Sequence, residues 1–124
     1  MKKIAFLAVL LTATVSFAAT SFDGTYQFQS RMKKGTADMT GWTGTMTIQN
    51  DTIARNYQSA DGTEKKFYTG SLTPSTSPFY LVKYTAAYKT EYVGMELKSK
   101  FTLSGNTLTI TSEDGQFVET WVKK

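Results

Sequence analysis

The closing stretch of the chain, Phe101 to Val122, is the feature that most constrains the fold. It consists of three β-patterned runs separated by two turn signals, Ser104-Gly105-Asn106 and Glu113-Asp114-Gly115. Glycine and asparagine tolerate the positive φ that tight hairpin turns need. Between the turns, Leu108 and Ile110 alternate with threonines. Because side chains alternate between the two faces of a strand, this pattern predicts an antiparallel meander with one buried face.

The same pattern recurs along the rest of the chain, with turn residues between nearly all of the runs. It predicts eight short strands: Phe22–Met32, Thr40–Gln49, Thr52–Ser59, Thr63–Thr73, Phe79–Lys89, Tyr92–Leu103, Asn106–Ser112 and Gln116–Lys123. Connections this short favour pairing between neighbouring strands. Closure into an up-and-down barrel would remove the exposed edges of such a sheet. The predicted fold is therefore an all-β, eight-stranded antiparallel meander closed into a barrel.

Several details of this plan are less uniform. Lys33–Asp38 is polar and predicts a loop, whereas Tyr84–Tyr92 has helical as well as strand character and stays open. On the first strand, the alternation predicts that Arg31 points outward. On the sixth, it predicts four inward side chains, which are Val93, Met95, Leu97 and Phe101. Gly44 lies on an inner face, where glycine is consistent with a bend or a tight barrel corner.

Membrane-embedded and water-soluble barrels share this alternation, but they turn their apolar faces in opposite directions. In a membrane barrel the apolar face contacts lipid, and here that face carries Arg55 and Glu119. A membrane strand also needs about 9–11 residues, more than Asn106–Ser112 provides. The other face is rich in threonine, glutamine and lysine, which suits a wall in water. The sequence therefore favours a soluble barrel over an integral membrane protein.

The first 18 residues have the layout of a secretory signal peptide. A basic start precedes the apolar run Ile4–Leu11, and Ser16 and Ala18 are small residues at the expected cleavage positions. The run is shorter than the about 20 residues of a membrane-spanning helix. We therefore predict one domain, 19–124, that is exported to the bacterial periplasm or secreted. Because the chain has no Cys, that domain depends on its core and not on disulfides.

Charge and residue types exclude several functions. Without Lys2 and Lys3, the chain has 12 basic and 10 acidic residues, and the basic residues are scattered along it. A net charge this small and this dispersed gives no reason to expect a nucleic-acid partner. The chain has no His and no Cys, which removes thiol nucleophiles, histidine triads and the commonest zinc ligands. The closest acidic pairs, Asp61 with Glu64 and Glu113 with Asp114, lie at predicted turns, where acidic residues are ordinary. We expect a monomer that is not an enzyme and needs no metal or other cofactor.

The strand plan resembles the lipocalin and fatty-acid-binding superfamily, the calycins, and in particular its small bacterial exported members. Gly24-Thr25-Tyr26 is similar to the Gly-x-Trp with which lipocalins open, and Gly105–Ile110 and Trp121–Lys124 resemble the ending of small bacterial lipocalin-like domains. The resemblance implies a soluble barrel with an interior ligand site. Fatty-acid-binding members carry Arg-x-Tyr on the last strand to hold the ligand carboxylate. This chain has Glu119-Thr120-Trp121 in that place.

Charged and aromatic residues on the inner face are the candidate ligand-binding residues. Arg55 and Glu119 lie in otherwise apolar rows, and a buried charge needs a partner, so each pairs with the other or with a ligand if both point inward. A plain structural ion pair is the alternative. The aromatic residues suit either a filled core or the wall of a small cavity, and we expect a partly filled barrel. The candidate residues are Tyr26, Trp42, Arg55, Tyr57, Tyr84, Phe101, Glu119 and Trp121.

These observations lead to two functional hypotheses. The first is a non-enzymatic exported barrel that binds a small apolar or amphipathic ligand in its interior. The second is a protein-interaction module, such as an envelope protein or an enzyme inhibitor, that acts through its loops. A ligand binder needs an open end and an internal void. An interaction module needs an exposed apolar or aromatic patch on its loops.

Overall fold

The computed structural model describes residues 22–124. The signal peptide predicted for residues 1–18 lies outside the described residues. The described part is built almost entirely from strands: β1 (Gly24–Lys33), β2 (Thr36–Asp38), β3 (Thr43–Gln49), β4 (Thr52–Gln58), β5 (Lys65–Pro74), β6 (Phe79–Ala87), β7 (Glu96–Ser104), β8 (Thr107–Ser112) and β9 (Phe117–Lys123). A single turn of 3₁₀ helix, η1 (Thr90–Tyr92), lies between β6 and β7.

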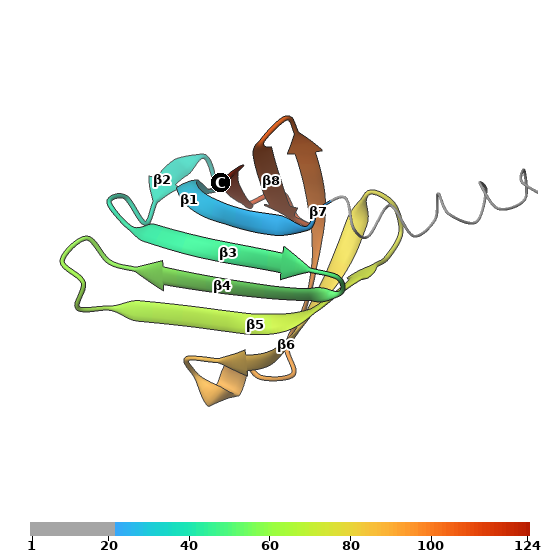
Figure 1. The fold of residues 1–124 in the computed structure, drawn as a ribbon, viewed down its shortest axis with the longest axis horizontal. Helices are drawn as coiled ribbons and strands as arrows, with labels where there is room; N and C mark the ends of the chain where they lie inside the picture. The colour runs from blue at the N-terminus through green and yellow to red at the C-terminus, as the bar shows by residue number, and fades with distance from the viewer. Residues whose placement is uncertain (1–21) are drawn as a thin grey trace, which may run out of the picture.

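The strands form one antiparallel sheet that closes on itself. Its order is β2-β1-β3-β4-β5-β6-β7-β8-β9, and β1 also pairs with β9. The C-terminus accordingly lies beside β1, and β7 runs past the ends of the front strands β1, β3, β4 and β5, with β8 next to it (Figure 1). The prediction of a closed up-and-down barrel of eight main strands is confirmed. The short β2 is an addition to this plan.

The prediction of a loop over Lys33–Asp38 is wrong, because this segment forms a hairpin. Its β2 pairs with the end of β1, with Arg31 opposite Asp38 and Lys33 opposite Thr36. The turn is made by Lys34 and Gly35, whose φ angles of 53° and 80° are both positive. Positive φ at both central residues is the conformation that a two-residue hairpin turn requires.

A bulge in β1 also overturns one of the predicted side-chain directions. In the pairing with β9, Phe28 lies opposite Trp121 and Ser30 lies opposite Thr120, so β1 contains one extra residue. An extra residue reverses the alternation beyond it. Arg31, which was predicted to point outward, therefore points into the barrel.

The segment between β6 and β7 settles the open question over Tyr84–Tyr92. β6 has a bulge where its pairing with β5 shifts between Thr69 and Gly70, then continues to Ala87, and η1 follows. β7 begins only at Glu96. The prediction that Val93 points inward is wrong, since its side chain is 48% exposed after the turn of η1.

The apolar side chains of the strands face the barrel interior, where they form one core. The buried apolar residues are Phe22, Tyr26, Met46, Ile48, Ile53, Tyr57, Leu72, Val82, Tyr84, Phe101, Leu108, Ile110 and Trp121. At one end, Phe22 packs against Tyr80 and Phe101 with ring centroids 5.1 and 5.6 Å apart. This packing fills that end of the barrel. Among residues 22–124, no helix has the length and apolarity needed to cross a membrane.

Two hairpin turns at the other end share one hydrogen-bonding design. In the β4–β5 turn, Asp61 accepts hydrogen bonds from the Ser59 hydroxyl at 2.8 Å and from the Thr63 backbone N–H at 3.1 Å. In the β8–β9 turn, Asp114 accepts the equivalent bonds from Ser112 at 2.7 Å and Gln116 at 3.0 Å. Two of the four carboxylates predicted to be turn residues, Asp61 and Asp114, have that role here.

Candidate functional site

A cavity of about 300 Å³ occupies the end of the barrel that the core does not fill. Its wall combines charged, tyrosine and apolar side chains from β1, β4 to β9 and η1: Arg31, Arg55, Lys98 and Glu119; Tyr57, Tyr68, Tyr84 and Tyr92; Met95, Leu97, Ile110 and Phe117; and Ser99 and Ser112. Met95 and Leu97 are 43% and 39% exposed. The cavity therefore reaches solvent beside the start of β7.

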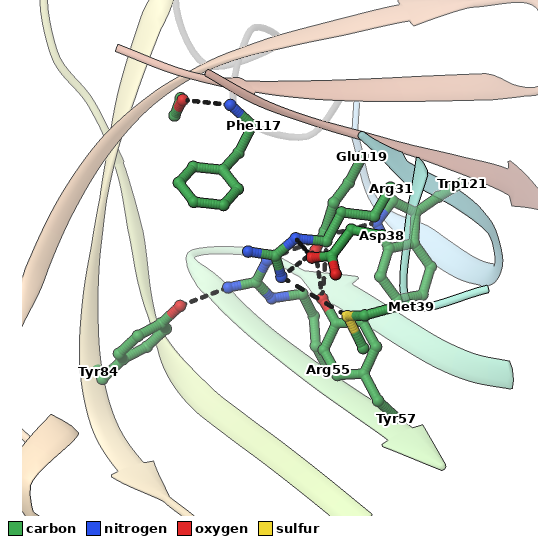
Figure 2. A network of polar contacts seen from close by, with 10 residues as sticks. Arg31, Asp38, Met39, Arg55, Tyr57, Tyr84, Phe117, Glu119 and Trp121 are labelled. Atoms are coloured by element: carbon green, nitrogen blue, oxygen red, sulfur yellow. Dashed lines mark hydrogen bonds and ion pairs between the residues drawn. The ribbon is translucent and has the colours of Figure 1, made fainter. Parts of the chain in front are cut away.

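Glu119 lies at the base of the cavity and accepts hydrogen bonds from four side chains (Figure 2). Its Oε1 accepts from Arg55 Nη1 at 3.4 Å and from the Trp121 indole N–H at 3.0 Å. Its Oε2 accepts from Arg31 Nη1 at 3.3 Å. The Tyr57 hydroxyl lies 2.9 Å from both oxygens. With the Glu119 side chain only 7% exposed, these partners replace the water that a buried carboxylate loses.

Arg31 enters this network because the β1 bulge turns it inward. It lies directly across from Glu119 in the pairing of β1 with β9. On its other side, Arg31 Nε is 3.3 Å from a carboxylate oxygen of Asp38, without the alignment of a hydrogen bond. The guanidinium also covers the Phe117 ring, 4.8 Å from its centroid. One arginine thus joins the interior carboxylate to the half-exposed carboxylate at the rim.

Arg55 reaches the cavity from the inner face of β4, where its side chain is 12% exposed. Besides contacting Glu119, its Nη2 donates to the Tyr84 hydroxyl at 2.5 Å, and its guanidinium lies over the Tyr68 ring at 5.5 Å. Burial acts to lower the pKa of Arg55, but Tyr57, Tyr84 and Glu119 raise it and prevail. The guanidinium therefore stays charged, with both a carboxylate and a phenol as partners.

Tyr57 and Trp121 form the floor beneath the carboxylate. Their rings meet edge to face at 5.6 Å, and Phe28 packs against both. Burial raises the pKa of Tyr57 well above its ordinary value of 10.0; Arg55 opposes this rise, and Glu119 adds to it. Tyr57 therefore remains a neutral hydrogen-bond donor to Glu119 at physiological pH.

Three tyrosines line one side of the cavity. The ring centroid of Tyr68 lies 5.1 Å from that of Tyr84 and 6.2 Å from that of Tyr92. The ring planes of Tyr68 and Tyr92 are nearly parallel, with an interplanar angle of 23°. The Tyr68 side chain points into the barrel. Aromatic side chains present a large apolar area together with a polar tip. This side of the cavity can therefore contact both the apolar and the polar part of a small molecule.

Comparison with solved structures identifies the architecture. The barrel is similar to a lipocalin-like protein from Bacteroides uniformis ATCC 8492, with a TM-score of 0.62 and 12% sequence identity, over 82% of this chain and 97% of that one. This is a lipocalin-like fold. An uncharacterized protein from Bacteroides eggerthii DSM 20697 is also similar, with a TM-score of 0.58 and 9% identity, over 83% of this chain and 99% of that one. No protein-family model and no curated protein matches the sequence. The predicted likeness to lipocalin-like proteins is confirmed at the level of the fold.

The lipocalin-like barrel brings together part of the predicted ligand-binding set. Arg55, Tyr57, Tyr84 and Glu119 line the cavity, with Trp121 beneath the carboxylate. The predicted pairing of Arg55 with Glu119 is present, at 3.4 Å.

The other three predicted residues lie away from this cavity. Tyr26 donates to the Phe22 carbonyl at 2.6 Å, and Phe101 packs against Phe22 at the filled end of the barrel. Trp42 is half-buried, with Lys66 Nζ 5.1 Å from the centroid of its ring.

Sequence reasoning missed several residues of the cavity. Arg31 was assigned to the outer face because nothing in the local sequence marks the bulge at Gln29. Tyr92 lies on η1, within the stretch whose state stayed open. Met95 and Leu97 were predicted to point inward, and both line the cavity at its opening. In residues 22–124, acidic side chains do not gather in groups of three that could hold a metal ion.

Proposed function

We propose that this protein binds a small amphipathic molecule in the interior of its barrel. The observation that carries the proposal is the cavity of about 300 Å³, which has polar groups at its base and aromatic and aliphatic side chains on its wall. Ligand sites are concave, largely apolar and equipped with a few convergent polar groups, and their volumes begin near ~300 Å³. The lipocalin-like fold supports the same proposal, because small eight-stranded barrels hold one small ligand.

The apolar part of the ligand would lie against Tyr68, Tyr92 and Leu97, near the opening. Its polar group would lie deeper, beside Arg55 and Tyr84. This orientation places the apolar chain on the aromatic side of the cavity and the polar group where hydrogen-bonding atoms already converge.

A titration with small amphipathic probes tests this proposal. Decanol, decanoate and decylammonium share one chain and differ in charge. Burying a chain of about nine methylene groups at ~0.8 kcal/mol each supports a Kd on the order of 10 µM for a matching probe. Calorimetry would give the affinity, and amide chemical shifts would locate the site. We expect shifts at Ser99 and Ile110 and none around Phe22.

A variant that fills the cavity tests the location of the site, and a variant on the outer face of the same strand is its matched control. Ser99 points into the cavity from β7, and Thr102 points outward from the same strand. We expect Ser99→Phe to weaken probe binding at least about tenfold, and Thr102→Phe to leave it unchanged, because only the first side chain occupies the void. Undiminished binding by Ser99→Phe, or shifts confined to the outer wall, would contradict an interior site.

The second candidate is the protein-interaction module, and one observation favours it. Val93, Met95 and Leu97 expose 48%, 43% and 39% of their surface next to one another along the chain. Exposed apolar side chains of this kind suit a partner surface. Val93 lies outside the cavity lining, so Val93→Ser should weaken partner binding while leaving the small probes bound.

Export and the absence of catalysis complete the proposal. The assignment to the periplasm or the extracellular space rests on the signal-peptide pattern of residues 1–18. Mass spectrometry of the protein isolated from its source would test it, since cleavage after Ala18 gives a defined N-terminus. The view that the protein is a carrier and not an enzyme rests on the lipocalin-like fold and on the lack of histidine and cysteine.

A further inference from the structure

The charges around the base of the cavity balance within the protein itself. Arg31 and Arg55 provide two positive charges, and Glu119 and Asp38 provide two negative ones. At the opening, Lys98 lies 3.5 Å from Glu113. A ligand therefore enters a site in which every cationic group has an anionic partner from the same chain.

Glu119 occupies the position that a ligand anion would otherwise take. Its two oxygens contact both guanidinium groups, Arg31 through Oε2 and Arg55 through Oε1. A second carboxylate beside it would meet like-charge repulsion in a poorly solvated site. A ligand cation would in turn lie against two guanidinium groups, which is equally unfavourable. Both kinds of charge are therefore disfavoured at the base of the cavity.

Hydrogen bonding nevertheless remains available there. Two contacts of Arg55 are accounted for, Nη1 to Glu119 and Nη2 to Tyr84, and a guanidinium has five N–H donors. The Tyr84 hydroxyl accepts from Arg55, so its own proton is left to donate. The base of the cavity thus offers donors to a neutral oxygen atom.

We propose that the ligand is an uncharged amphipath with a hydrogen-bond-accepting oxygen, such as an alcohol, ester or amide, and that Glu119 sets this selectivity by acting as a built-in counter-ion. This inference rests on the interior site proposed above and gives it a ligand class. The oxygen lies beside Arg55 and Tyr84, and the apolar chain follows the tyrosines toward the opening.

The same three probes test this inference. At pH 8 decanoate is negative, decylammonium positive and decanol neutral. We expect decanol to bind the wild-type protein at least about tenfold more tightly than either charged probe. Decanoate binding as tightly as decanol would overturn the selectivity while leaving the interior site intact. If none of the three probes binds, both proposals fail.

The rim carboxylate offers a variant that leaves the buried network in place. Asp38 is 39% exposed and contacts Arg31, so Asp38→Asn removes one negative charge without emptying the core. We expect decanoate affinity to rise about tenfold and decanol affinity to stay within about twofold, as a charge difference at short range implies. Asp51→Asn, in the exposed turn between β3 and β4, is the matched control and should change neither.

Glu119→Gln provides the stronger test. It removes the counter-ion itself, so the preference should reverse and decanoate should bind more tightly than decanol. If Glu119→Gln does not fold, Asp38→Asn decides the matter alone. Unchanged decanoate affinity in Asp38→Asn would overturn charge balance as the origin of the selectivity.

Discussion

Glu119 is a charged residue in a nearly buried position, a combination that is costly without partners. It is the only interior carboxylate among residues 22–124. A carboxylate in such a place needs several donors, and Tyr57, Trp121 and two arginines supply them. The donors in turn depend on Glu119, because each would otherwise be left without this partner. The loss of this one residue therefore affects the whole group.

Glu119→Ala should lower the free energy of unfolding by about 3 kcal/mol. Removing one partner of a buried ion pair leaves the other charge uncompensated, and here two guanidinium groups are affected. Urea unfolding would measure the change. Glu113→Ala is the control, because Glu113 is 60% exposed in its pair with Lys98 and such pairs contribute less than about 1 kcal/mol. Equal losses in the two variants would contradict a structural role for the network.

Tyr57 predicts a dependence of stability on alkaline pH. Its pKa in the folded protein is raised well above 10.0, first by burial. Above about pH 10 the unfolded chain loses the Tyr57 proton, while the folded chain still retains it. The free energy of unfolding therefore falls as the pH rises through this range. Tyr57→Phe lacks this ionisation and one hydrogen bond, which costs about 1–3 kcal/mol at neutral pH. In urea unfolding, the gap between wild type and variant should narrow above pH 10; a constant gap up to pH 11 would contradict this assignment.

At the scale of single residues, the sequence identified charged side chains that interrupt the apolar rows of the strands. Arg55 and Glu119 stand out because each interrupts an apolar row, and both prove to face the interior. Arg31 does not interrupt such a row, and its inward direction depends on a bulge that arises from pairing with β9, about 90 residues further along the chain. Local alternation contains no information about that pairing.

At the scale of elements, the paired turns explain why the hairpins were predictable. Ser59-Ala60-Asp61-Gly62 and Ser112-Glu113-Asp114-Gly115 each place a serine, an aspartate and a glycine at the same spacing. The glycines have φ angles of 76° and 77°, and in both turns the aspartate accepts from the backbone two residues later. All of these interactions are local, so the sequence alone specifies the reversal.

Asp61 gives this turn a characteristic response to acid. Hydrogen bonds from Thr63 and Ser59 lower its pKa from 3.8 to about 2. The stabilisation is therefore fully present above about pH 4 and is lost as the pH falls through 2. Asp61→Asn mimics the protonated form, so its unfolding temperature should lie below that of the wild type at neutral pH and approach it near pH 2. A difference that persists unchanged at pH 2 would contradict this origin.

The elements that were not predicted depend on distant partners. A side chain at position 70 would collide with the backbone of Lys83, so the fold needs glycine there. Gly70 lies at the bulge where β5 and β6 change register. The hairpin of β2, the end of β6 at Ala87 and the turn of η1 all lie around the opening of the cavity. The regular part of the barrel was thus predictable from alternation and turn residues, whereas the irregular part forms much of the candidate site.

At the scale of the whole molecule, closure of the barrel is uneven. β1 and β9 are joined from Tyr26–Lys123 to Lys33–Phe117. β6 and β7, by contrast, pair only from Phe79–Lys100 to Lys83–Glu96, followed by hydrogen bonds between Tyr84 and Met95 and between Gly94 and Tyr84. Beyond that point the two strands separate around η1. The wall therefore opens between β6 and β7, beside the cavity.

Hydrogen exchange should reveal this difference. We expect the amides of residues 88–95 to exchange much faster than those of β9, because local opening near η1 breaks few hydrogen bonds, whereas exposing β9 requires the barrel to open. Decanol should slow exchange in residues 88–95 and leave β8 unchanged. Equal protection of the two regions would contradict local opening of the barrel between β6 and β7.

The indole of Trp121 gives the protein an optical reporter of its own interior. The chain has two tryptophans. Trp121 is fully buried, and its N–H donates a hydrogen bond to Glu119, the carboxylate that also contacts both arginines. A change in the partners or the hydration of Glu119 alters the electric field across that ring. The emission colour of the unlabelled protein would therefore follow events at the base of the cavity, with Trp42→Phe removing the second emitter.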